Sequence, residues 1–175
     1  YGHDTMVPTE MSEYGITDRA VIDTADSLMA VKYLVFDTKQ LTMRELVDAL
    51  DSDFAGERGE EIRQMCLKAP KFGNDIEEVD LLARRVSLMS ADSITSYDNG
   101  PYPRFKSLRE GLSWHYAAGL GVGALPNGRK AFQPLDDGSA SPMRGMDENG
   151  PTAVLNSVLK ANFGDHSYVQ ALNQK

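Results

Sequence analysis

Cysteine and histidine are scarce in this sequence. Cys66 is the only cysteine among 175 residues, so an intramolecular disulfide is excluded and a zinc site built from thiolates is nearly excluded. The three histidines, His3, His115 and His166, lie far apart, and no two have the spacing of metal ligands on one helix. The sequence therefore predicts no metal site.

Positive charge is also in short supply. Lys and Arg total 18 against 26 Asp and Glu, which gives a formal net charge of −8. Proteins that bind nucleic acids or anionic membrane surfaces need clustered cations to neutralise phosphates. We therefore expect neither nucleic acid nor a membrane as a partner.

Long hydrophobic runs are missing as well. A transmembrane helix needs about 20 mainly apolar residues, and no such stretch occurs. The opening residues YGHDTMVPTE contain no basic segment followed by an apolar one, so they predict no secretory signal, and we expect a cytoplasmic location. The chain begins with Tyr1 and not with Met, as expected of a fragment or a processed chain.

The first half of the sequence has an apolar pattern of helical period. Apolar residues recur at intervals of three and four, which is typical of helices with one or more buried faces. Two pairs, Thr42 with Glu45 and Asn74 with Glu77, have the spacing of capping boxes at helix N-termini. The predicted helices cover about residues 18–36, a stretch from Thr42, residues 60–68 and a stretch from Asn74 to about residue 90.

Glycine and proline become frequent after residue 91. The stretch LSWHYAAGLGVGAL favours a strand that enters a loop, and GPTAVLNSVLKA favours a helix with Pro151 in its first turn. We therefore predict one domain over residues 1–175, with a helical region at about 18–90, a strand and loop region at about 91–150, and a helix at about 151–161.

The loop GALPNGRKAFQPLDDGSASP is the most unusual stretch. Gly123 and Gly128 have the spacing of a P-loop, but Arg129 and Lys130 follow where that motif needs Lys and then a hydroxyl, so nucleotide binding is not favoured. Apolar residues interrupt the loop as if they were buried anchors, which argues against a flexible linker. They are Leu125, Phe132, Leu135 and Met143.

Arg129 ends a segment, PNGR, that has the form of a tight turn in which the Asn or the Gly takes a positive φ. Its five fixed donors suit either a buried carboxylate, with Asp136 and Asp137 as candidates, or several backbone carbonyls. The alternative is an ordinary solvated surface charge.

The stretch ALPNGRKAFQPLDDGSASPMRGMDENGPTAVLNSVLK closely resembles the run of fixed Pro, Gly, Arg, Asp and Ser positions in the glycyl radical enzymes, the pyruvate formate-lyase-like superfamily. The stretches ADSLMAVKYLVFDTKQLTMRELVDALDSDF and IRQMCLKAPKFGNDIEEVD resemble the helices that precede this run in the family. The resemblance extends from about Gly15 to Lys160, in the family's order.

The resemblance implies an α/β fold, part of a ten-stranded α/β barrel wrapped by helices, with a mainly helical N-terminal half. It also implies a parent enzyme whose backbone glycyl radical, installed by a radical S-adenosylmethionine activating enzyme, takes hydrogen from a cysteine thiol. The thiyl radical then takes hydrogen from the substrate. Burial of such a site protects the radicals from water and oxygen.

Two parts of the family's machinery are missing from this sequence. It contains neither the glycine motif R-V-x-G-[YF] nor the cysteine motif G-C-x-E, and Cys66 lies among apolar helix positions, as a small buried hydrophobe would. The resemblance therefore implies an internal portion between the two loops, inactive alone, with no catalytic residue and no bound cofactor of its own. Its implied partners are a small-molecule substrate, the activating enzyme, the rest of the enzyme on the same or a second polypeptide, and a second copy of the parent in a homodimer.

In the family, the strand before the P-x-G-R turn passes the substrate cavity. That position implies substrate-binding roles for Gly121, Val122, Gly123, Ala124 and Leu125. Glu10 or Glu13 is a weaker candidate for positioning a polar substrate group, and an ordinary surface carboxylate is favoured for each. Arg129, Asp136, Asp147 and Thr152 are expected to be scaffold. For Trp114, His115 and Tyr116, packing is favoured over the alternative of contact with the substrate.

The function implied is therefore that of a cavity wall and scaffold in a radical lyase, decarboxylase, dehydratase or synthase that acts on a small organic substrate. The stretch WHYAAGLGVGALPNGRK resembles pyruvate formate-lyase itself less than it resembles the arylacetate decarboxylases or the fumarate-adding synthases. The alternative is a non-catalytic, acidic, helical interaction module built on the same scaffold.

Overall fold

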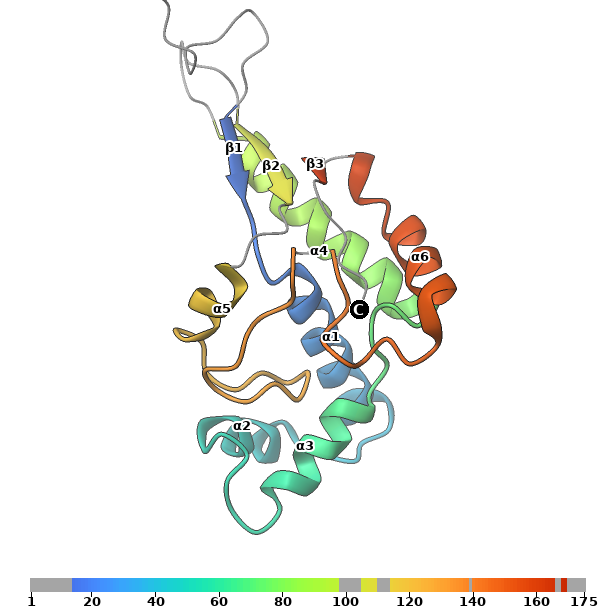
Figure 1. Ribbon diagram of the computed structural model, residues 1–175. Helices are drawn as coiled ribbons and strands as arrows, with labels where there is room; N and C mark the ends of the chain where they lie inside the picture. Colours follow the sequence, from blue (N-terminus) through green and yellow to red (C-terminus); the bar gives the residue numbers. More distant parts are fainter. Residues whose placement is uncertain (1–13, 98–104, 110–113, 139, 166–167, 170–175) are drawn as a thin grey trace, which may run out of the picture.

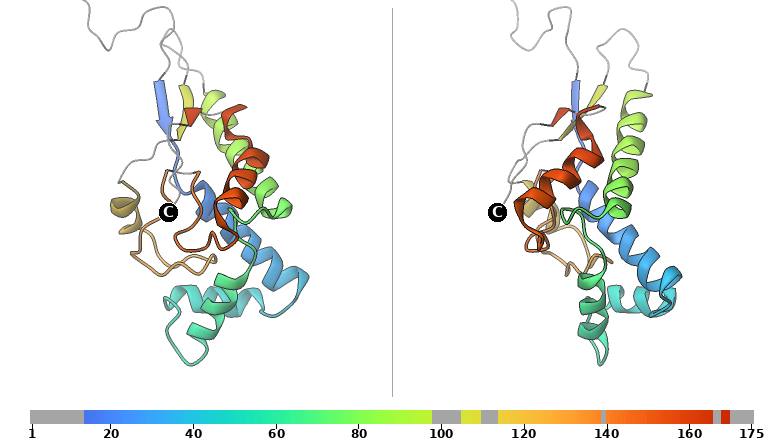
Figure 2. Two further views of the ribbon diagram at one scale, coloured as in Figure 1. Left: turned by 45° about the vertical axis from the view of Figure 1, so that its right-hand side comes forward. Right: turned by 90° about the vertical axis from the view of Figure 1, so that its right-hand side faces the viewer.

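The computed structural model describes residues 14–97, 105–109, 114–138, 140–165 and 168–169 (Figure 1). The small sheet lies at one end of the molecule, and α2 and α3 lie at the other end (Figures 1 and 2). The elements follow one another as β1 (Tyr14–Thr17), α1 (Val21–Val31), η1 (Lys32–Asp37), α2 (Met43–Asp51), α3 (Gly59–Lys68), α4 (Glu77–Thr95), β2 (Phe105–Arg109), α5 (Trp114–Gly119), α6 (Gly150–Ala161), η2 (Phe163–Asp165) and β3 (Tyr168–Val169).

Three helices form the centre of the structure. The helix predicted at 18–36 is present as α1, which continues into the π-helical turn η1. α1 packs against α4, and α4 packs against α6. Their shared core includes the fully buried Ile22, Phe72 and Val79. Each such side chain contributes about 1.5–3 kcal/mol by leaving water, so this cluster is a main source of stability.

The sheet has three short parallel strands in the order β1-β2-β3. Tyr14 pairs with Phe105, and Leu108 pairs with Tyr168. All of the helices α1 to α4 lie between β1 and β2 in the chain, as parallel pairing requires a long crossover. The described part of the fold is therefore mostly helical with a small parallel sheet.

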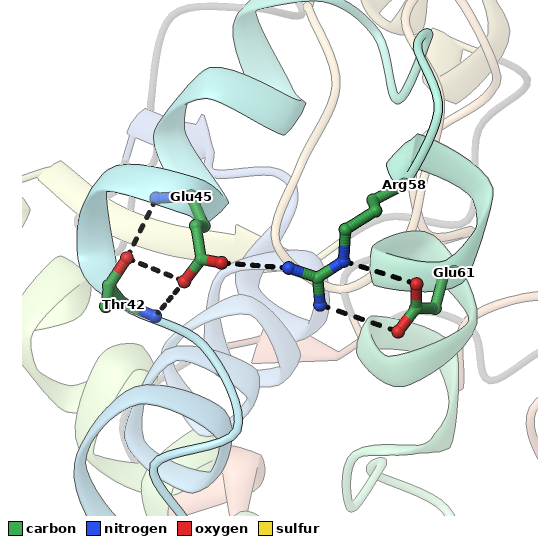
Figure 3. A network of polar contacts seen from close by, with 4 residues as sticks. All are labelled: Thr42, Glu45, Arg58 and Glu61. Atoms are coloured by element: carbon green, nitrogen blue, oxygen red, sulfur yellow. Dashed lines mark hydrogen bonds and ion pairs between the residues drawn. The ribbon is translucent and has the colours of Figure 1, made fainter.

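The predicted capping box at Thr42 is confirmed. Thr42 Oγ1 accepts a hydrogen bond from the Glu45 N–H, and the Thr42 N–H donates to Glu45 Oε2 at 2.8 Å (Figure 3). Arg58 Nη1 donates to Glu45 Oε1 at 2.9 Å, and its Nε donates to Glu61 (Figure 3). These ion pairs are about half exposed, so each contributes little to stability by itself, but together they join the start of α2 to the start of α3.

The second predicted box, Asn74 with Glu77, is wrong. α4 begins at Glu77 after Ile76, and no side chain caps it. Asn74 instead donates from Nδ2 to the Met146 carbonyl at 2.6 Å and accepts the Asn149 N–H at 3.0 Å. A long-range partner therefore takes the side chain that a local cap would have used.

The strand predicted within LSWHYAAGLGVGAL is also wrong. Residues Trp114–Gly119 form the short helix α5, and residues 120–125 form turns and irregular chain. The carbonyls of Gly119, Val122 and Gly123 accept hydrogen bonds from the Arg129 guanidinium, and this segment is not among the strands of the described sheet. Further on, the predicted helix at 151–161 is confirmed as α6, with Pro151 in its first turn.

Candidate functional site

The 120–138 loop folds around the side chain of Arg129. This side chain is only 1% exposed, and burial lowers its pKa, an effect that the charges of Asp23 and Asp53 oppose. Its nitrogens donate to backbone carbonyls on both sides of the turn: those of Gly119, Val122, Gly123, Gln133 and Pro134. Of the alternatives drawn from the sequence, the carbonyl network is therefore correct, and both the solvated charge and pairing with Asp136 or Asp137 are wrong.

A tight turn brings Arg129 into this position, as the sequence predicted. The Gly128 N–H donates to the Leu125 carbonyl at 3.0 Å, and the Leu125 N–H donates to the Arg129 carbonyl at 2.9 Å. Gly128 takes a φ of +95°, and a Cβ there would lie 2.7 Å from the Leu67 side chain. Glycine is required at this position both by the dihedral angle and by the close approach to α3.

Asp23 joins the 120–138 loop to α1. Its Oδ1 accepts from Asn127 Nδ2 at 2.7 Å, and its Oδ2 accepts from the Asp136 N–H at 2.7 Å. Asn127 Oδ1 accepts from the Arg129 N–H at 3.0 Å. One buried carboxylate thus fixes both branches of the loop against the helix.

The sequence analysis did not identify Asp23. The available signal was weak: two acidic residues, Asp23 and Asp26, interrupt the apolar part of a helix that is buried on more than one side. Buried carboxylates are uncommon unless they have partners, so their presence there indicates partners elsewhere in the chain.

The five predicted substrate residues occupy three kinds of environment. Val122 and Leu125 line an apolar groove of about 400 Å³. Ala124 packs against the cluster around Leu34 and Leu41, and Gly121 and Gly123 are exposed. The groove is also lined by α1 and the residue before it, including Ala20, Thr24, Ser27, Leu28 and Val31.

A second cavity of about 320 Å³ lies on another side of the same loop. Its lining includes Arg63, His115, Asp136, Asp137 and Asp147. His115 Nδ1 lies 3.5 Å from Asp137 Oδ1, and the Leu135 N–H donates to the His115 carbonyl. The lining of this cavity is mixed and more polar than that of the groove beside Val122.

The structure separates the residues that the sequence had grouped as packing or as anchors. His115 is buried as predicted, but Trp114 is 63% exposed and Tyr116 also projects into solvent, because α5 packs only along the side that carries His115. Phe132 is 67% exposed and is no anchor. Of the expected scaffold residues, Asp136 is buried, Asp147 is half-buried and Thr152 is exposed. Glu10 and Glu13 lie outside the described residues.

Cys66 is buried in the cluster formed by α2, α3 and η1, as a small hydrophobe. Burial raises the pKa of its thiol to about 11, so it is held as the unreactive thiol. Within the described ranges, no three His, Cys, Asp or Glu side chains gather in an arrangement for a metal ion. Of the helices described, none has the length and apolar character to cross a bilayer.

Residues 8–112 match the family model described as pyruvate formate lyase-like. The chain therefore belongs to the pyruvate formate-lyase-like glycyl radical enzymes, of which it is a segment. This assignment agrees with the resemblance carried by the PNGR loop, which lies outside the matched residues and supports it independently.

Individual relatives show the same relationship. The isethionate sulfite-lyase of Bilophila wadsworthia is 42% identical over 137 residues, which are 74% of this chain and 15% of that protein. The glycerol-bound structure of the B12-independent glycerol dehydratase from Clostridium butyricum is 43% identical with a TM-score of 0.77, over 85% of this chain and 19% of that one. The indoleacetate decarboxylase of Tractidigestivibacter scatoligenes is less similar, at 29% identity over 91% of this chain and 20% of that protein. The chain spans about a sixth of the length of the isethionate sulfite-lyases that it matches.

Proposed function

We propose that this chain forms part of the ten-stranded barrel of a glycyl radical enzyme, and that its 120–138 loop supplies part of the substrate-cavity wall. The reaction is a lyase, dehydratase, decarboxylase or synthase step on a small organic molecule in the cytoplasm. The glycyl radical, the thiyl cysteine, the contact with the radical S-adenosylmethionine activating enzyme and the homodimer interface belong to the remainder of the parent enzyme.

The observation that carries this proposal is the fixed position of Val122 and Leu125 beside the apolar groove. Arg129 donates hydrogen bonds to the Val122 and Gly123 carbonyls, and these contacts restrain the main chain of this segment. A wall that does not move can hold a substrate at the distance that hydrogen abstraction requires. Gly121 and Gly123 have open space where a Cβ would stand, with at most one atom near, so a substrate can approach the main chain there.

A chimera tests the proposal. Residues 14–165 of this chain would replace the equivalent segment of the Clostridium butyricum glycerol dehydratase, and the chimera would be activated anaerobically. Electron paramagnetic resonance measures the glycyl radical, and turnover of glycerol measures the chemistry. We expect Val122→Trp to leave the radical signal intact and to lower kcat/KM for glycerol at least tenfold.

Glu57→Trp is the matched control, since Glu57 is exposed in the connection between α2 and α3. It should change neither signal nor turnover. The proposal fails if Val122→Trp and Leu125→Trp both retain the turnover of the unmodified chimera, because a cavity wall cannot accept two indoles without effect.

The alternative is an independent interaction module. Trp114, Tyr116 and Leu120 are all more than half exposed on and after α5. Large exposed apolar side chains mark a surface that another protein segment covers, and membership of the family favours the rest of the parent enzyme as that cover. A monodisperse isolated chain with one cooperative unfolding transition would favour the module.

A further inference from the structure

Asp136 is a buried carboxyl group whose oxygens lack a well-aligned hydrogen-bond donor. It lies in the 120–138 loop with 6% of its surface exposed, and no group donates a hydrogen bond of good geometry to either side-chain oxygen. An ionised carboxylate in such a place would cost several kcal/mol, so the neutral acid is the stable form. The O–H of a neutral acid can donate one hydrogen bond, so Asp136 needs an acceptor nearby.

Among the charged groups around Asp136, one carboxylate is placed to accept a hydrogen bond from its O–H. The Asp23 carboxylate on α1 lies within hydrogen-bonding reach of the Asp136 side chain, and Asp26 acts on it from one turn further along the same helix. Burial is the main cause that raises the pKa of Asp136 well above its usual range, and the charge of Asp23 raises it further, with the Ile22 N–H opposing both. The other charged or titratable groups at this cavity are Arg63 from α3, His115 and Tyr116 from α5, and Arg129, Asp137, Arg144 and Asp147 from the loops.

We propose that Asp136 is a positioning residue whose carboxyl group stays protonated and donates a hydrogen bond to the Asp23 carboxylate. The shared proton fixes the loop to α1. Asp23 then accepts three hydrogen bonds from the loop: from the Asn127 side chain, the Asp136 N–H and the Asp136 O–H. A hydrogen bond from a carboxylic acid to a carboxylate is charge-assisted and short, and two adjacent carboxyls commonly hold one proton between them.

Loss of this proton changes the attraction between Asp136 and Asp23 into repulsion. Two carboxylates would then face each other in a buried place, and their repulsion would separate the loop from α1. The segment that carries Val122 and Leu125 is part of this loop, so its position depends on the proton as well. The inference concerns contacts within this chain and does not rest on the proposed function, since it is measured without substrate or radical.

Infrared spectroscopy of the full chain tests the inference directly, because a carboxylic acid has a carbonyl band that a carboxylate lacks. At pH 7 we expect this band in the wild type and a clear loss of its intensity in Asp136→Asn, which keeps the shape and an N–H donor toward Asp23. Asp137→Asn is the matched control, since Asp137 is adjacent in sequence but lies beside His115, and it should leave the band unchanged. Asp26 contributes a separate share of the band, because its pKa is also raised, to about 7.

The rate of tryptic cleavage at Arg129 and Lys130 gives the second measurement. As the pH is raised from 7, the cleavage rate, taken relative to that of an unstructured trypsin substrate at each pH, should rise several-fold in the wild type and in Asp137→Asn and change little in Asp136→Asn. Equal band intensity at pH 7 in the wild type and in a folded Asp136→Asn protein would overturn the inference. If Asp136→Asn does not fold, the double variant with Asp26→Asn and Asp80→Asn is used, because burial also raises the pKa of Asp80. An acid band that persists at pH 8 in this variant supports the shared proton, and its absence rejects it.

Discussion

Asn127 and Asp23 are joined by a buried hydrogen bond of 2.7 Å, although 104 positions separate them in the chain. Both ends of the Asn127 amide are used, since its oxygen accepts the Arg129 N–H while its nitrogen donates to Asp23. The orientation of the amide is therefore fixed, and the PNGR turn is fixed to α1 with it.

Asn127→Asp should destabilise the fold strongly near neutral pH. The substitution replaces a donor by a carboxylate that faces Asp23, and leaving a buried charge unpaired costs about 3–5 kcal/mol. The measurement is the free energy of unfolding in urea at pH 7 and at pH 5. The deficit should shrink in acid, because a protonated carboxyl can donate again. Gln40→Glu adds the same charge at an exposed site and should cost less than about 0.5 kcal/mol at either pH.

Arg129→Lys should not be conservative. A lysine has one ammonium group and cannot donate to carbonyls on both branches of the loop, so several buried acceptors would lose their partners. We expect a loss of about 3 kcal/mol in the free energy of unfolding, measured by urea titration. Arg44→Lys is the control, since Arg44 makes only an exposed ion pair with Asp48, and it should be nearly neutral. Equal midpoints for the two variants would contradict the structure of the loop.

Gly128→Ala should be costly, and Gly123→Ala should be tolerated. Gly128 has a φ of +95° and lies against Leu67, so an added methyl group meets both backbone strain and a steric contact. Strain of this kind costs about 1–3 kcal/mol. Gly123 has an ordinary φ and nothing within 4 Å of an added Cβ. Thermal unfolding of the two variants side by side makes the comparison, and a Gly128→Ala protein as stable as Gly123→Ala would disprove it.

Asp26→Asn should flatten the dependence of stability on pH. Burial is the first cause that raises the pKa of Asp26 from 3.8 to about 7, while the charge of Lys71 and the Phe72 N–H oppose it. A group with a raised pKa in the folded state stabilises the fold fully below its unfolded pKa, and the contribution is lost as pH rises through the folded pKa.

The wild type should therefore lose up to about 1.4 kcal/mol per pH unit from this group between about pH 4 and pH 7. In the variant, the amide oxygen can still accept the Phe72 N–H, which donates to Asp26 at 2.8 Å in the wild type. Urea titrations at four pH values measure the slope, and an unchanged slope in Asp26→Asn would show that this carboxyl does not titrate there.

The sequence predicted features that depend on neighbours in the chain. α3 at Gly59–Lys68 and the Thr42–Glu45 box were predictable because helix periodicity and capping act over three or four residues. The tight turn at PNGR was predictable for the same reason.

Features that depend on distant partners were not predictable in this way. Asn74 was expected as a cap but contacts residues 146 and 149. The sequence indicated only weakly that Asp23 has distant partners and did not indicate residues 127 and 136. The segment before Leu125 has residues suited to a strand, but two of its carbonyls accept hydrogen bonds from the distant end of the Arg129 side chain. Part of the site could thus be predicted from its residues and from the family, while the links that hold it could not.

The pairing of β1 with β2 has a kinetic consequence. Tyr14 can pair with Phe105 only after the intervening segment, which contains α1 to α4, has folded so that the two strands lie side by side. Closing so large a loop costs entropy before any strand contact repays it, and pairs of this kind form late in folding. We therefore expect the helices α1 to α4 to form on a ribosome-bound or refolding chain well before the sheet does. Stopped-flow circular dichroism should record helix formation as the earlier phase.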